Sequence, residues 1–86
     1  MDTNDELRVK KLRWRCRRGM KELDVILTRF LDEKYPTLDE PTKLDFVAFL
    51  EESDMDLLNW CTGRSVPSNG TYDTLLHALR LHGQHA

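Results

Sequence analysis

Apolar residues recur at helical spacing through the first 34 residues of this 86-residue chain, and this pattern constrains the fold more than any other feature. The apolar positions before and after Gly19 are almost in phase, so the sequence permits one continuous helix over residues 4–34. At about 1.5 Å per residue such a helix would extend about 45 Å, whereas a compact domain of this length has a diameter of roughly 30 Å. We therefore predict a break near residues 17–19, between helices over about 4–15 and 19–34.

Helical spacing continues through the rest of the chain, and no segment alternates apolar and polar residues as a half-buried strand does. Three more helices are expected, over about residues 39–52, over about 54–62, and from Thr71 onward. Thr37 or Asp39 can cap the first of these, because both side chains accept hydrogen bonds from a first helical turn. The sequence therefore predicts an all-α fold, a small single-domain bundle of five helices.

One shared hydrophobic core is expected within a single domain spanning residues 1–86, with a disordered C-terminal tail from about residue 83. Hydrophobic residues make up 40% of the chain and charged residues 33%, which fits a compact helical protein and argues against general disorder. Trp60 is expected in this core. The apolar faces of the first, third and fourth helices also include Leu7, Leu44 and Met55. The other expected core residues are Leu12, Leu23, Leu27, Phe30, Val47, Leu50, Leu58, Leu75 and Leu79.

The net charge of −2 conceals two oppositely charged regions. Eight lysines and arginines lie within residues 8–21, and no acidic residue lies between Glu6 and Glu22, whereas the remainder is acidic. Such a division steers partners and fixes their orientation. The segment 13–15, Arg-Trp-Arg, could contact phosphates and stack on bases, but a pI near 5.9 is far from that of a nucleic-acid domain. We expect a protein partner and no nucleic acid.

Several function classes find no support in the sequence. No apolar run approaches the roughly 20 residues of a membrane span, and the acidic first residues are unlike a secretory signal, so we expect no membrane insertion and a bacterial cytoplasmic location. Cys16 and Cys61 have no CxxC spacing, and His77, His82 and His85 lack an HxxxH arrangement, so no metal site is expected. Neither a catalytic constellation nor a Gly-rich phosphate loop is present, so we expect no enzyme.

Gly19 lies within a helical pattern, between a basic pair and a Lys-Glu pair. In a helix interior glycine costs about 1 kcal/mol relative to alanine, so something local must compensate. One explanation is a helix boundary that needs a permissive backbone. The other is a surface that a partner's backbone approaches closely, with Arg18, Lys21 and Glu22 supplying charged hydrogen bonds around the gap.

Residues 14–24, with the sequence WRCRRGMKELD, resemble the RGxxE signature region of the small SdhE family, also called YgfY, the flavinylation factors of succinate dehydrogenase and fumarate reductase. Residues 54–60, with the sequence DMDLLNW, are similar to the second motif region of that family, an acidic D-x-D-L followed by Asn-Trp. The length and the order of the helices fit as well. The resemblance covers essentially the whole chain except its C-terminal tail.

The resemblance implies an assembly chaperone that binds the flavoprotein subunit of succinate dehydrogenase or fumarate reductase. It would promote covalent attachment of FAD to a histidine of that subunit, by favouring the competent arrangement of the subunit. FAD would be bound by the partner, and the chain, a monomer, would hold no cofactor of its own. The family motif matches Arg18, Gly19 and Glu22. All residues expected to bind the partner are Trp14, Arg17, Arg18, Gly19, Met20, Lys21, Glu22, Asp24 and Asn59.

The residue types leave some roles open. Arg18 could bind a partner carboxylate or phosphate in a bidentate manner, and Glu22 could orient that arginine or pair with a partner cation. Trp14 points away from the apolar stripe of its helix and is a candidate exposed anchor, while Asn59 could cap a helix or bond to the RGxxE segment. The alternative function is a generic protein-interaction or antitoxin-like module without a flavinylation role.

Overall fold

The structure is a computed structural model that describes residues 3–68 and 70–84. Those residues form five α-helices and one short 3-10 helix, with no strand among them, which confirms the all-α fold. Helix α5 continues to residue 84, past the start of the expected disordered tail, and residues 85–86 of that tail lie outside the described part. The elements are α1 (Thr3–Arg15), α2 (Lys21–Glu33), η1 (Tyr35–Thr37), α3 (Glu40–Phe49), α4 (Asp54–Cys61) and α5 (Asp73–Gln84).

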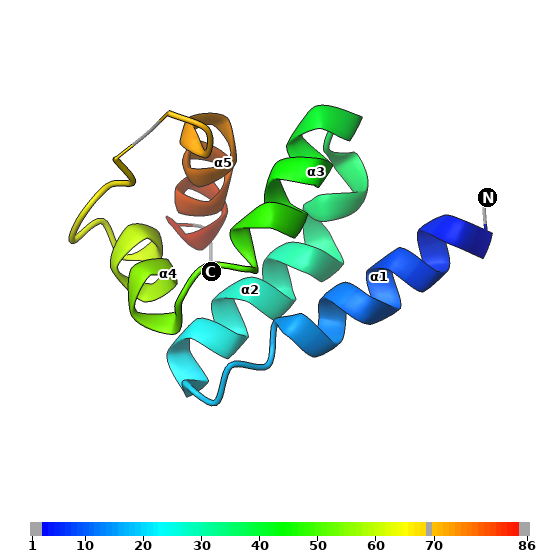
Figure 1. Cartoon of the computed structure of the whole chain (residues 1–86), viewed down its shortest axis with the longest axis horizontal. Coiled ribbons are helices and arrows are strands. Elements are labelled where there is room, and N and C mark those ends of the chain that lie inside the picture. The colour runs from blue at the N-terminus through cyan, green and yellow to red at the C-terminus, as the bar shows by residue number, and fades with distance from the viewer. Residues whose placement is uncertain (1–2, 69, 85–86) are drawn as a thin grey trace.

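The predicted break between the first two helices is confirmed. Helix α1 ends at Arg15, α2 begins at Lys21, and Gly19 between them has φ +87°, a conformation that glycine adopts without the penalty of a side chain. The chain reverses direction there, so α1 runs back alongside α2 (Figure 1). The longest dimension of the structure is 37 Å, which is shorter than one continuous helix over both segments would need.

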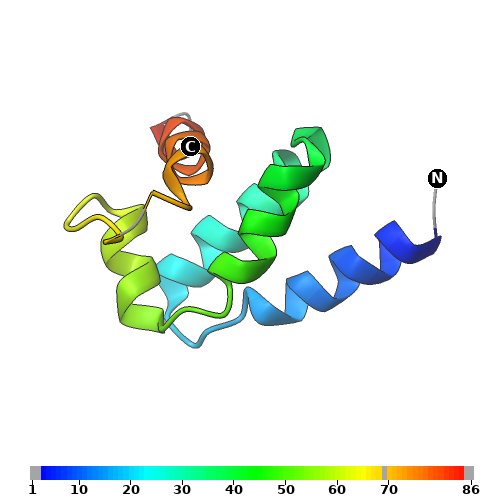
Figure 2. The same cartoon turned by 45° about the horizontal axis from the view of Figure 1, so that its top comes forward.

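Helix α2 lies at the centre of the bundle and contacts α1, α4 and α5. Helix α3 packs on α5 and on α2, where the rings of Phe30 and Phe46 lie 5.4 Å apart. Both cartoon views place α1 at one edge of the molecule and α4 and α5 toward the opposite edge (Figures 1 and 2). The connection between α1 and α2 therefore lies at the end of the bundle where α4 begins.

The expected core residues share one hydrophobic cluster. Leu23, Leu27, Phe30 and Leu31 form the buried stripe of α2, and each such side chain contributes about 1.5 to 3 kcal/mol by leaving water. Trp60 is only 9% exposed, and its ring packs against those of Phe49 in α3 and Tyr72 just before α5, which confirms its expected place in the core. Val47 and Leu58 are partly buried against the cluster. Its other buried members include Leu12, Cys16, Phe46, Phe49, Leu50, Leu57, Leu75 and Leu79.

Three apolar residues that were expected on buried faces are instead about half exposed: Leu7, Leu44 and Met55. In α3 the buried positions are Thr42, Phe46 and Phe49, and a residue two positions before Phe46 points to the opposite side of a helix that turns about 100° per residue. Met55 is exposed for the same reason, because it lies two positions before the buried Leu57 in α4. Leu7 belongs to the half of α1 that extends away from the bundle (Figure 1). The prediction was wrong at these positions.

Helices α3 and α4 begin with side-chain caps. The carboxylate of Asp39 accepts a hydrogen bond from the Thr42 amide at 3.1 Å, and hydrogen bonding from the Thr42 side chain and amide lowers the pKa of Asp39. The Ser53 hydroxyl accepts from the Asp56 amide at 3.2 Å. Both caps satisfy N–H groups that have no partner inside the helix, so they fix where α3 and α4 begin.

Candidate partner-binding site

The residues predicted to bind a partner fall mainly on the end of α1, the connection over residues 16–20 and the first turn of α2. Five of them are exposed, and we call these the Gly19 surface: Trp14, Arg17, Gly19, Lys21 and Glu22. Met20 is partly buried and packs against the hydrophobic core. Asn59 lies on α4, where its backbone carbonyl accepts from the amides of residues 64 and 65. Within the described residues no hydrogen bond joins Asn59 to residues 17–24.

The side chain of Arg18 is directed into the protein and is only 17% exposed. Its Nε donates to the Asp54 carboxylate at 2.7 Å. Its Nη1 donates to the Leu50 carbonyl at 2.7 Å and to the Arg15 carbonyl at 3.1 Å, and its Nη2 donates to the Glu52 carbonyl at 2.8 Å. The guanidinium thus connects the end of α1 with the α3–α4 connection and with the first residue of α4.

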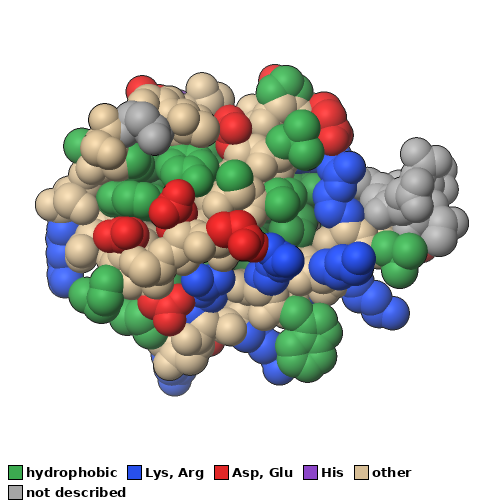
Figure 3. Space-filling view, viewed as in Figure 1, with side chains coloured by type: hydrophobic (Ala, Val, Ile, Leu, Met, Phe, Trp, Pro, Cys, Tyr) green, Lys and Arg blue, Asp and Glu red, His purple; other side chains and the backbone are tan. Residues whose placement is uncertain are grey.

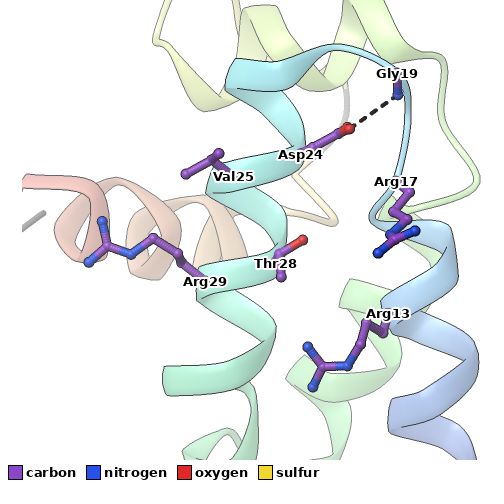
Figure 4. A pocket seen from close by; sticks show the side chains of 7 residues that line it. All are labelled: Arg13, Arg17, Gly19, Asp24, Val25, Thr28 and Arg29. Atoms are coloured by element: carbon purple, nitrogen blue, oxygen red, sulfur yellow. Dashed lines mark hydrogen bonds between the residues drawn. The ribbon is translucent and has the colours of Figure 1, made fainter.

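Asp24 holds the backbone of the same connection from the other side. One carboxylate oxygen accepts from the Arg18 amide at 2.7 Å and the other from the Gly19 amide at 3.3 Å (Figure 4). Met20 occupies the N-cap position of α2 without a side-chain cap, so Asp24 supplies the carboxylate near this helix N-terminus. A negative charge is stabilising there because the helix dipole is positive at that end. The exposed Glu22 benefits from the same field.

Gly19 faces open space. A Cβ atom placed on it would have no heavy atom within 4 Å. Packing within the chain therefore does not require glycine here; the backbone conformation does, because a side chain at φ +87° costs about 1 to 2 kcal/mol. The helix-boundary explanation of this glycine is confirmed, and its open face leaves room for the close approach of a partner.

Beside Gly19, a shallow groove separates α1 from α2 (Figure 4). Arg13 and Arg17 point into it from the α1 side, and Asp24 and Thr28 from α2. Trp14, in the last turn of α1, is 71% exposed, and the Arg17 guanidinium lies 5.4 Å from the centre of its ring, within cation–π distance. All residues lining the groove are Arg13, Arg17, Gly19, Asp24, Val25, Thr28 and Arg29.

The basic segment is partly neutralised by the acidic remainder of the chain. Four of its eight cations form ion pairs with α2, α3, α4 or the α3–α4 connection, namely Arg8–Glu40, Arg13–Asp32, Arg15–Glu51 and Arg18–Asp54. The other four make no ion pair within residues 3–68 and 70–84, and they are Lys10, Lys11, Arg17 and Lys21. Lys and Arg side chains gather along α1, and Asp and Glu side chains lie beside them over the neighbouring helices (Figure 3).

Sequence reasoning missed the partner of Arg18. Glu22 was considered as the group that orients this arginine, but Asp54 does so, and Glu22 makes no ion pair in the described part of the chain. Asp54 was visible only as part of the second motif region. A signal was present in the opposite charges of the two segments, although they lie 36 residues apart.

The described residues offer no reactive thiol and no metal cluster. Burial raises the pKa of both Cys16 and Cys61 to about 12, so both are protonated at neutral pH. No group of three or more His, Cys, Asp or Glu residues in that part of the chain could hold a metal ion. His85, one of the histidines considered in the sequence, lies outside it. None of the helices there combines the length and the hydropathy that crossing a membrane would require.

Known proteins resemble this chain over most of its length. The model of the Sdh5 family, described as "Flavinator of succinate dehydrogenase", matches residues 10–83. A protein of Coxiella burnetii named "FAD assembly factor SdhE" is 36% identical over 77 residues, which cover 90% of this chain and 94% of that protein. Proteins of the same name from Vibrio vulnificus and Pectobacterium atrosepticum are 38% identical over 72 residues (84% of both chains) and 34% identical over 70 residues (81% and 80%). The chain belongs to the Sdh5 family of succinate dehydrogenase flavinators.

Proposed function

We propose that this chain is an FAD assembly factor that binds the flavoprotein subunit of succinate dehydrogenase and promotes covalent attachment of FAD to it. The observation that carries this proposal is the family match over residues 10–83, together with relatives named FAD assembly factor that align over four fifths or more of the chain. The RGxxE segment and the second motif region both fall within the matched range.

The Gly19 surface is the proposed contact with the flavoprotein subunit. Its backbone lies open at Gly19, and its side chains combine an exposed aromatic ring with the charges of Arg17, Lys21 and Glu22. Because glycine has no side chain, a partner chain can approach the backbone more closely at glycine than at any other residue. The arginines of the neighbouring groove suit an acidic segment of the partner, so the complex should weaken as salt increases.

The proposed action is not catalytic. The factor would bind the conformation of the flavoprotein subunit in which FAD and the accepting histidine are correctly placed, and so raise the population of that conformation. FAD is held by the partner in this proposal, and the bond-forming chemistry belongs to the flavin and that histidine. The chain's own contribution is shape and charge at the Gly19 surface. It acts in the bacterial cytoplasm as a monomer, and fumarate reductase is proposed as a second client.

The test uses the flavoprotein subunit produced in cells that lack the assembly factor, so that it carries no covalent flavin. The purified subunit is mixed with FAD, with or without this chain, and covalent flavin is read as in-gel fluorescence after denaturation. Gel filtration of the mixture reports the complex and the oligomeric state. We expect a one-to-one complex and a clear rise in covalent flavin. If the chain neither binds the subunit nor changes its covalent flavin, the proposal is wrong and the general interaction module becomes the better account.

A further inference from the structure

The hydrogen bonds of Arg18 are almost fully used within the chain. A guanidinium carries five N–H donors, and four hydrogen bonds lead from this one to Asp54 and to three backbone carbonyls. The carbonyls of Leu50 and Glu52 lie just beyond α3, where helix-end carbonyls have no partner within the helix. Arg18 therefore satisfies groups that its own fold leaves open, and little of its fork remains for another molecule.

The same bonds join two segments that lie far apart in the sequence. Arg18 belongs to the RGxxE segment, and Asp54 is the first residue of α4, 36 positions later. Asp24 fixes the amides of Arg18 and Gly19 from the opposite side. The backbone at Gly19 is thus held between a carboxylate of α2 and, through the arginine, a carboxylate of α4.

We propose that Arg18 acts as a positioning residue, with Asp54 as its necessary partner, and that together they hold the Gly19 surface in the shape that the flavoprotein subunit binds. This inference rests on the proposed function and deepens it, because it assigns the motif arginine an internal role and adds Asp54 to the residues on which binding depends. A lysine cannot replace Arg18, since one ammonium group cannot reproduce the planar fork that reaches a carboxylate and three carbonyls.

The chain offers a matched control in Asp56. It lies in the same first turn of α4 as Asp54 and is exposed, but no hydrogen bond or ion pair in the described residues joins it to Arg18. The substitutions Asp54→Asn and Asp56→Asn remove the same charge from the same helix end, so both alter the helix dipole interaction and the long-range field equally. Only Asp54→Asn weakens the ion pair with Arg18.

The experiment measures binding of the flavoprotein subunit by the intact chain and by Arg18→Lys, Asp54→Asn, Asp56→Asn and the double variant Arg18→Lys with Asp54→Asn. All measurements are made well below the melting transition of each variant. We expect Arg18→Lys and Asp54→Asn each to weaken binding about tenfold. The double variant should bind no more weakly than either single variant, because the two changes disrupt the same interaction between Arg18 and Asp54. Asp56→Asn should bind within about twofold of the original chain.

A second measurement needs no partner. Amide spectra and hydrogen exchange of the isolated chain should show a shifted, faster-exchanging Gly19 amide in Asp54→Asn and an unchanged one in Asp56→Asn. The inference is overturned if Asp54→Asn keeps the Gly19 amide and the affinity of the Asp56 control while Arg18→Lys loses binding, since Arg18 would then contact the partner directly. If the original chain itself does not bind the subunit, the proposed function fails. The amide measurement still decides whether the ion pair between Arg18 and Asp54 positions Gly19.

Discussion

The connection between α1 and α2 and the one that follows α4 place a glycine in the same backbone conformation but hold it by different means. Gly19 has φ +87° and Gly63 has φ +79°, and neither would meet a heavy atom within 4 Å if a Cβ were added. After α4, the Gly63 amide donates to the Trp60 carbonyl and the Arg64 amide to the Asn59 carbonyl. This backbone pattern, a Schellman motif, ends the helix. The Thr62 hydroxyl adds a hydrogen bond to the Leu58 carbonyl at 2.7 Å, and the Arg80 guanidinium adds one to the Trp60 carbonyl at 3.2 Å.

The connection over residues 16–20 lacks that pattern and is held by charged side chains from three elements. Arg18 and Asp24 together make six hydrogen bonds. Four lead from the Arg18 guanidinium to α4, the α3–α4 connection and the end of α1, and two lead from the amides of Arg18 and Gly19 to the Asp24 carboxylate. Ending a helix does not require so many charged groups, as the connection that follows α4 and contains Gly63 shows. The difference indicates that the shape of the Gly19 surface, and not only the end of α1, is what these side chains maintain.

The largest expected difference between the two connections concerns their arginines. Arg18→Ala leaves the Asp54 carboxylate and three carbonyls without their donor, and we expect a loss of about 3 kcal/mol in the free energy of unfolding. Arg64 is exposed and its side chain makes no hydrogen bond or ion pair in the described residues, so Arg64→Ala should change stability by less than about 0.5 kcal/mol. Urea unfolding of both variants checks this. Equal losses in the two variants would show that the hydrogen bonds of Arg18 do not stabilise the fold.

The two glycines should resemble each other in stability. Gly19→Ala and Gly63→Ala each place a side chain at positive φ in open space, so each should lose about 1 kcal/mol, which lowers Tm by roughly 5 °C in a domain of this size. Thermal unfolding followed by circular dichroism gives both values. A Gly19→Ala variant as stable as the original chain would mean that the connection relaxes to another conformation.

The smallest expected effect concerns two thiols, those of Cys16, the first residue of the connection over residues 16–20, and Cys61, the last residue of α4. Cys16 is fully buried and Cys61 partly buried, and burial raises the pKa of each to about 12 from an ordinary value of 9.0. At pH 8 only about one thiol in 10⁴ is then ionised, so a thiol reagent should modify both slowly, Cys61 a few-fold faster than Cys16. Faster labelling of Cys16 than of Cys61 would show that the connection over residues 16–20 opens more readily than the end of α4.

The same thiols make stability depend on pH. Raising the pH ionises the thiols of the unfolded chain first, so their contribution to stability is complete below about pH 9 and is lost toward pH 12.

Much of the fold could be predicted from the sequence, because helical spacing of apolar residues and the need to fit a compact domain both act locally. The five helices, the break before α2 and most of the core were predicted for that reason. Leu44 and Met55 misled the prediction, since a short helix with apolar residues on several sides does not reveal which side packs. The site was predicted in part: exposure at Trp14 and Gly19 agrees, whereas the tie between Arg18 and Asp54 depends on how α4 packs against α2.

The central claim is that the open backbone at Gly19 is where the flavoprotein subunit is engaged. The most direct test compares Gly19→Arg with Gly63→Arg, two changes with the same strain at positive φ and the same added bulk and charge, on connections of which only one belongs to the proposed contact. Covalent flavin on the partner subunit is measured by in-gel fluorescence, with both variants shown to be folded. We predict that Gly63→Arg supports flavinylation as the original chain does and that Gly19→Arg supports almost none. Full flavinylation with a folded Gly19→Arg, or an equal loss with both variants, would contradict it.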